Sequence, residues 1–229
     1  MNQKLIRTVN NQMVINAIEI LTDDLDATKK FYAGILGFRT AKENTNSIAF
    51  VAGHTMLTFI KSTQLSPQYH FAFNIPCNKL NEALAWAASK FGLIKIVGDE
   101  LVANFDSWNA KAFYFFDNNG NILEFIARYD LSNHSDRSFS SSSIQSVSEI
   151  GIVTDDPLQL ADALSKENDI PVFEKGSRTT QFVTLGDDHG LLIIVATNRT
   201  WYPTEQPAGK YYTKISMNIP GRQKEITVN

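Results

Sequence analysis

The chain of 229 residues contains very little cysteine and histidine. Its one cysteine, Cys77, has no partner in the chain, so an internal disulfide is excluded. The four histidines do not combine with Cys77 in a zinc-finger spacing. A chain without these covalent or metal links is typical of a reducing compartment, and we expect the protein in the cytoplasm.

An excess of basic charge is also missing. Lysine and arginine number 21 against 24 acidic residues, a net charge of -3, which does not favour binding to a phosphate backbone. No run approaches the roughly 20 apolar residues of a membrane span, and the first residues, MNQKLIRTVNNQ, lack the apolar core of a signal peptide. We therefore expect neither a nucleic acid nor a membrane as partner.

A serine-rich stretch interrupts the apolar periodicity in the middle of the chain. Residues 131–146 include SNHSDRSFSSSS, which offers little to bury and predicts a linker. It would separate a first domain, residues 1–130, from a shorter second domain, residues 147–221. The last residues, 222–229, are expected to be a tail.

The feature that is present is a repeat of strand, helix and further strands. Units of this kind are predicted over residues 13–60, 69–128 and 147–196. The first helix begins after Asp24 and ends at Gly37, and the third begins at Asp156-Pro157, a capping residue followed by proline in the first helical position. A tight hairpin at Gly53-His54 joins two strands of the first unit.

The opening strands of the units match one another. AIEILTDDL (17–25) and EIGIVTDDP (149–157) share their pattern and a Thr-Asp-Asp ending, while HFAFNIPCN (70–78) and KISMNIPG (214–221) share Asn-Ile-Pro. Ala17, His70, Glu149 and Lys214 are thus equivalent positions. The sequence predicts three βαβββ units and one single strand of a fourth, an α+β fold in which helices cover curved mixed sheets.

Three segments resemble the vicinal-oxygen-chelate superfamily of glyoxalases, bleomycin-resistance proteins and extradiol dioxygenases. They are DLDATKKFYAGILGF (24–38), HFAF (70–73) and AFYFFDNNGNILEFIA (112–127). The resemblance implies that tandem βαβββ units form half-barrels around a small-molecule pocket, with the second domain truncated. In metal-dependent members, inward-facing His, Glu or Gln side chains bind a divalent cation.

Matched to that family, the ligand positions of the first domain are Ala17, His70 and Glu124. His70 and Glu124 have donor atoms suited to such a cation, whereas the methyl group of Ala17 has none. A carboxylate within the apolar strand around Glu124 is costly unless it is paired or bound to a metal. Glu19 lies on the same strand face as Ala17, about 6.8 Å further along, and could replace it as third ligand.

Other side chains are expected to line the same pocket. Strand alternation turns Asn74 to the face of His70, with Phe71, Phe73 and Ile75 on the opposite face. Aromatic residues complete the proposed lining: Trp108, Tyr114 and Phe116. Each of these aromatics could equally serve packing alone.

The second domain is expected to contain no metal site. Its two equivalent positions are Glu149 and Lys214, which carry opposite charges. They are predicted to pair inside the concave face, or cup, of the second half-barrel. The unfinished second half-barrel favours self-association as a homodimer. Cys77 is expected to be a structural thiol without a neighbouring histidine, and His54, His134 and His189 are expected in solvated loops or the linker.

Two functions follow from the sequence. The first is an enzyme of the glyoxalase, lyase or dioxygenase kind, which holds Mn, Fe, Ni, Co or Zn on His70 and Glu124, with Glu124 and Glu19 in catalysis. The alternative is a metal-free protein that sequesters an aromatic molecule or an antibiotic in the same cup. Ala17 favours the alternative, and the His70 and Glu124 pair favours the enzyme.

Overall fold

The computed structural model describes residues 12–62 and 66–229. The N-terminal segment, from which the absence of a signal peptide is inferred, therefore lies mostly outside the described residues. Within the described ranges no helix combines the length and the apolar run needed to cross a bilayer.

The first unit has the predicted order of one strand, one helix and three strands. Its helix begins where the sequence predicts, because the Asp24 side chain accepts a hydrogen bond from the Ala27 amide. The elements are β1 (Val14–Thr22), α1 (Leu25–Lys29) with its π-helical continuation (Lys30–Ile35), β2 (Arg39–Glu43), β3 (Ser47–Ala52) and β4 (Thr55–Lys61).

The second unit has the same order, except that four strands follow its helix and the first two of these are very short. Its elements are β5 (His70–Ile75), α2 (Leu80–Ala88), β6 (Leu93–Ile94), β7 (Ala103–Phe105), a 3-10 turn (Asp106–Trp108), β8 (Ala110–Phe116) and β9 (Ile122–Arg128). The turn between β8 and β9 ends at Gly120, whose φ of +76° lies in the left-handed region that glycine favours.

The third unit is shorter than predicted, and the fourth is longer. The third has β10 (Ser146–Thr154), α3 (Pro157–Asn168), β11 (Phe182–Asp187) and β12 (Gly190–Ala196), so only two strands follow its helix. The fourth is a hairpin of β13 (Thr213–Ile219) and β14 (Arg222–Val228). Residues 222–228 are therefore a paired strand and not a tail, since β14 hydrogen-bonds along the whole of β13.

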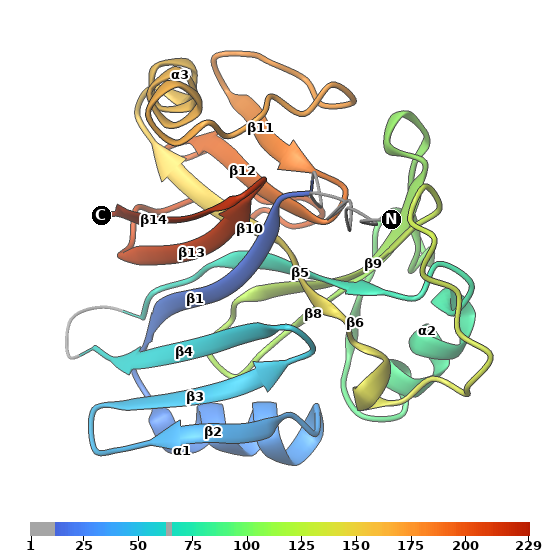
Figure 1. The fold of residues 1–229 in the computed structure, drawn as a ribbon. Helices are drawn as coiled ribbons and strands as arrows, with labels where there is room; N and C mark the ends of the chain where they lie inside the picture. The colour runs from blue at the N-terminus through green and yellow to red at the C-terminus, as the bar shows by residue number, and fades with distance from the viewer. Residues whose placement is uncertain (1–11, 63–65) are drawn as a thin grey trace, which may run out of the picture.

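Two sheets contain these strands, and each sheet joins units that are distant in the sequence. The first and fourth units form a sheet in the order β14-β13-β1-β4-β3-β2, so that the blue β1 lies beside the red β13 in Figure 1. The second and third units form the other in the order β11-β12-β10-β5-β9-β8-β6, with β7 beside β8. The opening strands meet antiparallel in both sheets.

This pairing differs from the predicted one. The sequence grouped the first unit with the second and the third with the fourth, so that residues 1–130 would form one half-barrel. The observed hydrogen bonds cross the boundary at 131–146 instead, because β10 adds to the edge of β5. The opening strand of the first unit has β13 as its antiparallel neighbour.

The serine-rich segment is more firmly held than a linker that buries little. Phe139 and Ile144 are buried in it, and a 3-10 turn (Ser141–Ser143) forms within it. The His54 amide donates to the Gln145 carbonyl oxygen over 2.8 Å. Gly53 is required at this crossing, because a Cβ there would lie 1.9 Å from that oxygen and its φ is +61°.

The main apolar core contains residues of both sheets, of α2 and α3, and of the π-helical continuation of α1. Alternation along β5 works as predicted: Phe71, Phe73 and Ile75 join this core, while His70, Ala72 and Asn74 face the other side. A second, smaller apolar cluster that includes Ala72, Tyr114 and Trp201 fills that other side. His70 therefore faces this second cluster, whereas Asn74, further along the same face of β5, lines a separate groove.

Candidate metal centre

His70 begins β5, between β9 and β10, and is almost fully buried. Its Nδ1 atom lies 3.1 Å from the Ile122 carbonyl oxygen, which can only accept a hydrogen bond. The proton of a neutral ring is therefore placed on Nδ1, and Nε2 keeps a free lone pair. Burial lowers the pKa of His70 to about 4, so the ring is neutral at pH 7.

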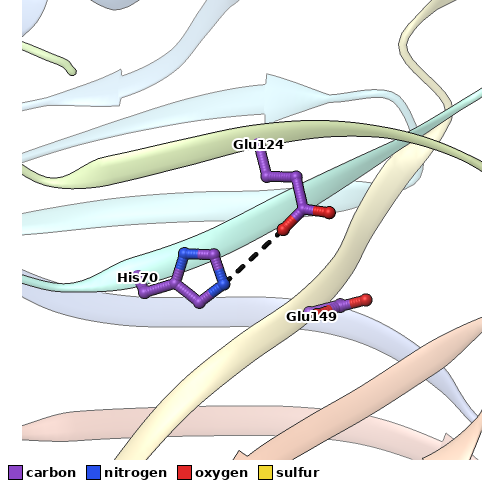
Figure 2. A group of neighbouring side chains, drawn as sticks. All are labelled: His70, Glu124 and Glu149. Atoms are coloured by element: carbon purple, nitrogen blue, oxygen red, sulfur yellow. Dashed lines mark ion pairs between the residues drawn. The ribbon is translucent and has the colours of Figure 1, made fainter. Parts of the chain in front are cut away.

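Glu124 occupies the middle of β9, and its carboxylate points toward the His70 ring (Figure 2). Glu124 Oε2 lies 3.6 Å from His70 Nε2. Burial raises the pKa of Glu124 well above its usual range; the nearby Glu149 raises it further, and Arg128 opposes both. The side chain also shares a hydrogen bond with Tyr114, which stands opposite it on β8.

Glu149 enters the same site from β10. Its register partner on β5 is Ala72, two residues after His70, and its side chain is buried. Ligand atoms of His70, Glu124 and Glu149 all lie within 4.8 Å of one another. The three residues come from three neighbouring strands, as Figure 2 shows.

The prediction for Glu149 was wrong. Glu149 does not meet Lys214, because β10 pairs with β5 and Lys214 lies on β13, in the other sheet. Lys214 Nζ instead lies 3.1 Å from Glu225 Oε1 on the adjacent β14, where both side chains are partly exposed. The repeat identified Glu149 as the equivalent of Ala17 and His70, but the sequence assigned it an ion pair with Lys214 and no role at a metal site; its antiparallel neighbour is β5.

Arg128 supplies the positive charge beside Glu149. Its side chain is completely buried, forms an ion pair with Glu149, and donates from Nε to Ser148 Oγ over 3.2 Å. Its Nη1 atom lies 3.4 Å from Asp188 Oδ1. Burial raises the pKa of Glu149, and Arg128 acts in the opposite direction. The site thus contains one buried arginine and two buried carboxyl groups, those of Glu124 and Glu149. A bound cation would supply the positive charge that Arg128 alone does not.

A cavity of about 290 Å³ opens over these residues. Ile193 on β12 lines it at the position that corresponds to Glu124 in the third unit. Most of the remaining wall is aromatic: Phe105, Trp108, Tyr114, Phe182, Trp201 and Tyr202. The site is therefore a polar floor of one histidine and two carboxylates under largely aromatic walls.

The structure brings several predicted residues together and separates others. His70, Glu124, Trp108 and Tyr114 line this one cavity. Phe116 is 42% exposed near the end of β8 and is not among the lining residues of the cavity in the described chain.

Two predicted residues lie elsewhere. Asn74 lines a separate groove, together with His54 and His189. Glu19 lies in the six-stranded sheet, where Glu19 Oε1 accepts a hydrogen bond from the Tyr212 hydroxyl over 2.5 Å. Because β1 does not pair with strands of the second unit, the fold does not bring Glu19 to His70 and Glu124.

Cys77 has a histidine neighbour, contrary to the expectation from sequence. His134 Nδ1 lies 3.4 Å from Cys77 Sγ, and the Asn133 side chain accepts a hydrogen bond from the Cys77 amide over 3.0 Å. The segment predicted as a linker therefore packs against this buried thiol.

Sequence reasoning assigned no role in the site to Arg128, Arg199, Trp201 or Tyr202. A signal existed for two of these: Trp201-Tyr202 is an aromatic pair in the polar stretch TNRTWYPTEQ. Arg128 gave a weaker signal, since a charged residue at the end of a strand is ordinarily solvated.

Comparison with solved structures supports the same architecture. A "putative dioxygenase" of Bacillus subtilis superposes with a TM-score of 0.60 at 17% identity, over 95% of this chain and 67% of that one. A V278E mutant of glyoxalase I from Zea mays gives a TM-score of 0.57 at 11% identity, over 94% of this chain and 92% of that one. At these identities the likeness shows the fold alone.

No curated protein matches the sequence. A family model does: the one described as the glyoxalase/bleomycin resistance protein/dioxygenase superfamily matches residues 14–193, from β1 into β12. That match covers more than half of the chain and includes His70, Glu124 and Glu149. The chain belongs to the glyoxalase/bleomycin resistance protein/dioxygenase superfamily.

Proposed function

We propose that His70, Glu124 and Glu149 bind one divalent cation, and that the protein is a metal-dependent enzyme of the glyoxalase, lyase or dioxygenase kind acting on a small molecule. The observation that carries this proposal is the convergence of three ligand atoms within 4.8 Å, all buried, at the floor of an aromatic cavity. Family membership and the general role of metals in this superfamily support it.

The chemistry of the three side chains fits such a cation. One imidazole nitrogen and two carboxylates form a mixed donor set that suits Mn, Fe, Co, Ni or Zn. The Ile122 carbonyl oxygen accepts the Nδ1 proton of His70, which leaves Nε2 free to bind a metal. Three protein ligands would leave positions for substrate oxygens, which the bound metal would polarise as a Lewis acid.

The residues around the ligands have separate tasks. Arg128 holds the Glu149 carboxylate, and Tyr114 holds that of Glu124, so that both are oriented before a ligand enters. Burial raises the pKa of Glu124, and a carboxyl group with a raised pKa is suited to exchange a proton with a bound molecule. The aromatic walls exclude water from this exchange.

Metal binding by the full chain tests the proposal. Protein purified without chelator is analysed for metal and then titrated with Mn²⁺, Co²⁺ and Zn²⁺ by calorimetry, alongside His70→Ala and Glu149→Ala. We expect one site per chain, weakened at least about tenfold in both variants. Thr58→Ala, at the position in β4 that corresponds to Glu124, is the matched control and should bind normally. Absence of binding in the parent, or unchanged binding in both ligand variants, contradicts the proposal.

A second candidate function is a metal-free binding protein. The observation that favours it is the ion pair of Arg128 with Glu149, which partly neutralises the site without a metal. This function would be supported if the protein still bound a hydrophobic probe in excess chelator and showed no metal-dependent turnover of a substrate. Chelator-sensitive turnover would exclude it.

Location in the cytoplasm and assembly as a homodimer remain predictions. The six-stranded sheet ends in β2 and β14, two edge strands that a second copy could cover. Sedimentation equilibrium at micromolar concentration tests the dimer, and a single monomeric species would contradict it.

A further inference from the structure

The loop of residues 197–209 borders the cavity and contributes three side chains to its wall. It leaves β12 after Ala196 and is closed by its own backbone hydrogen bonds, from Asn198 to Ala208 over 3.0 Å and from Trp201 to Gln206 over 2.9 Å. Arg199, Trp201 and Tyr202 of this loop line the cavity. The structured backbone of the loop fixes them over the floor of the site.

Arg199 is a half-buried cation without a carboxylate partner among residues 12–62 and 66–229. Its Nη1 atom donates to the Thr200 carbonyl oxygen over 3.3 Å, and its guanidinium lies 5.1 Å from the centre of the Phe182 ring. Burial lowers the pKa of Arg199. Arg128, in contrast, meets both Glu149 and Asp188. A partly desolvated arginine that stacks on a cavity wall has free donors for an incoming anion.

Trp201 adds an unused hydrogen-bond donor. The side chain is 3% exposed, and its Nε1 atom has no hydrogen-bond partner within the described part of the chain. Its ring centre lies 5.1 Å from that of His70. Gly151 on β10 makes room for the indole, since a Cβ there would lie 2.6 Å from Trp201 Cη2. A buried indole N–H without a partner is unfavourable until an acceptor reaches it.

We propose that the cavity selects a flat aromatic ligand that carries a carboxylate, with Arg199 as the binding group for that carboxylate. The aromatic walls, Trp201 among them, would stack on the ring. Arginine binds a carboxylate through two parallel N–H donors, which gives both charge and orientation. A volume of about 290 Å³ matches a small ligand. The inference rests on the proposed function only in placing this ligand over the metal site.

The test compares two ligands of the same shape. Binding of 2-naphthoate and of the neutral 2-naphthamide to the full chain is measured by calorimetry, in chelator and again with saturating Zn²⁺. We expect the parent to prefer the carboxylate about tenfold or more in at least one condition. Arg199→Gln should remove that preference, Arg199→Lys should retain part of it, and Arg137→Gln, at an exposed arginine of the 131–146 segment, should leave it unchanged.

Each outcome decides the inference. Preference below threefold in both conditions overturns it, as does a preference that Arg199→Gln and Arg199→Lys both leave intact. If Arg199→Gln does not fold, the parent comparison and the lysine variant still decide. Metal binding without a carboxylate preference would overturn this inference and leave the proposed function standing. A carboxylate preference in chelator without any metal binding would do the reverse.

Discussion

The two sheets contain the same repeat in the same register, yet among the described residues only the eight-stranded sheet forms a candidate metal site. In the eight-stranded sheet, Glu149 pairs with Ala72, which lies two residues after His70. In the six-stranded sheet, Lys214 pairs with Glu19, which lies two residues after Ala17. The equivalent of Glu124 is Thr58. We call the first set, His70, Glu124 and Glu149, the closed cup and the second, Ala17, Thr58 and Lys214, the open cup.

The strand pairing is equivalent in the two cups, so they differ in their side chains and in the segments that lie beside them. The closed cup has three buried residues that could bind a metal, β11 and β12 beside β10, and side chains of the 197–209 loop in the wall of its cavity. The open cup has only the β13–β14 hairpin at that place, and Lys214 and Glu225 remain partly exposed. A shared fold thus permits a site without creating one, and chemistry has to be argued from the residues.

The largest expected effect concerns the buried cation of the closed cup. Arg128→Met leaves Glu149 and Asp188 without their buried partner, and breaking such a pair costs about 3–5 kcal/mol. Urea melts measure the loss in free energy of unfolding. The double variant Arg128→Met with Glu149→Leu should recover part of it. Near-equal midpoints for parent and single variant would show that Arg128 does not compensate the buried carboxylates.

The pH dependence of stability should be steeper with His70 than without it. The pKa of His70 is 6.5 in the unfolded chain and about 4 in the folded one, so the unfolded chain binds the proton more tightly. Proton binding therefore favours the unfolded chain and lowers the free energy of unfolding. This loss is absent above pH 6.5 and grows to about 3 kcal/mol as the pH falls to 4. The difference between parent and His70→Gln, measured in chelator across this window, isolates the effect from that of Glu124. A constant difference would contradict a buried neutral ring.

Metal should stabilise the closed cup alone. A ligand at 100 times its dissociation constant adds about 2.7 kcal/mol to the free energy of unfolding, which corresponds to a rise in Tm of about 5–10 °C for a chain of this size. Thermal melts with and without Zn²⁺ measure the rise. Glu124→Gln should lose it, and Thr58→Ala in the open cup should keep it. Equal loss in both variants would show that the two cups do not differ as described.

A methyl group on β10 should disturb the wall of the closed cup. Gly151→Ala places a Cβ 2.6 Å from Trp201 Cη2, so the indole has to move, and such overpacking costs about 1–3 kcal/mol. Urea melts give the cost, and quenching of tryptophan fluorescence by acrylamide should rise. Gly34→Ala, where a Cβ would meet nothing within 4 Å, is the matched control. Equal stability of the two variants would mean that Trp201 does not pack as described.

The smallest effect is expected in the open cup. Lys214→Met removes a partly exposed ion pair with Glu225, which contributes about 0–1 kcal/mol. The melt of this variant should therefore lie close to that of the parent. A loss comparable to that of Arg128→Met would show that the open cup is a buried site in solution, as a dimer partner over it could cause.

Local features of this fold were predictable from the sequence. The capping residues Asp24 and Asp156, the Gly53-His54 hairpin and the alternation in β5 each depend on a few neighbouring residues, and the structure confirms them. The length of the fourth unit was underestimated because β14, RQKEITV, is mostly polar and exposed. An edge strand with one weakly buried face gives little hydrophobic signal.

The candidate site was half predictable. His70 and Glu124 stand on neighbouring strands of one unit, and the family resemblance had matched both of them to ligand positions. Glu149 was recognised as an equivalent position and assigned the wrong partner. Arg199 and Trp201 lie in an irregular loop, whose path depends on contacts distant in the sequence, so periodicity carries no information about it.

The sequence by itself determined the repeating unit, the face of each opening strand and the residue types that chemistry requires. Only the tertiary structure decided which units pair, and therefore that Glu149 completes the site of His70 and Glu124 while Glu19 faces Lys214 across the other sheet. The physical reason is that the four opening strands carry nearly the same apolar pattern. Local propensity cannot distinguish their partners, and the choice depends on how the connecting segments close and how the whole core packs.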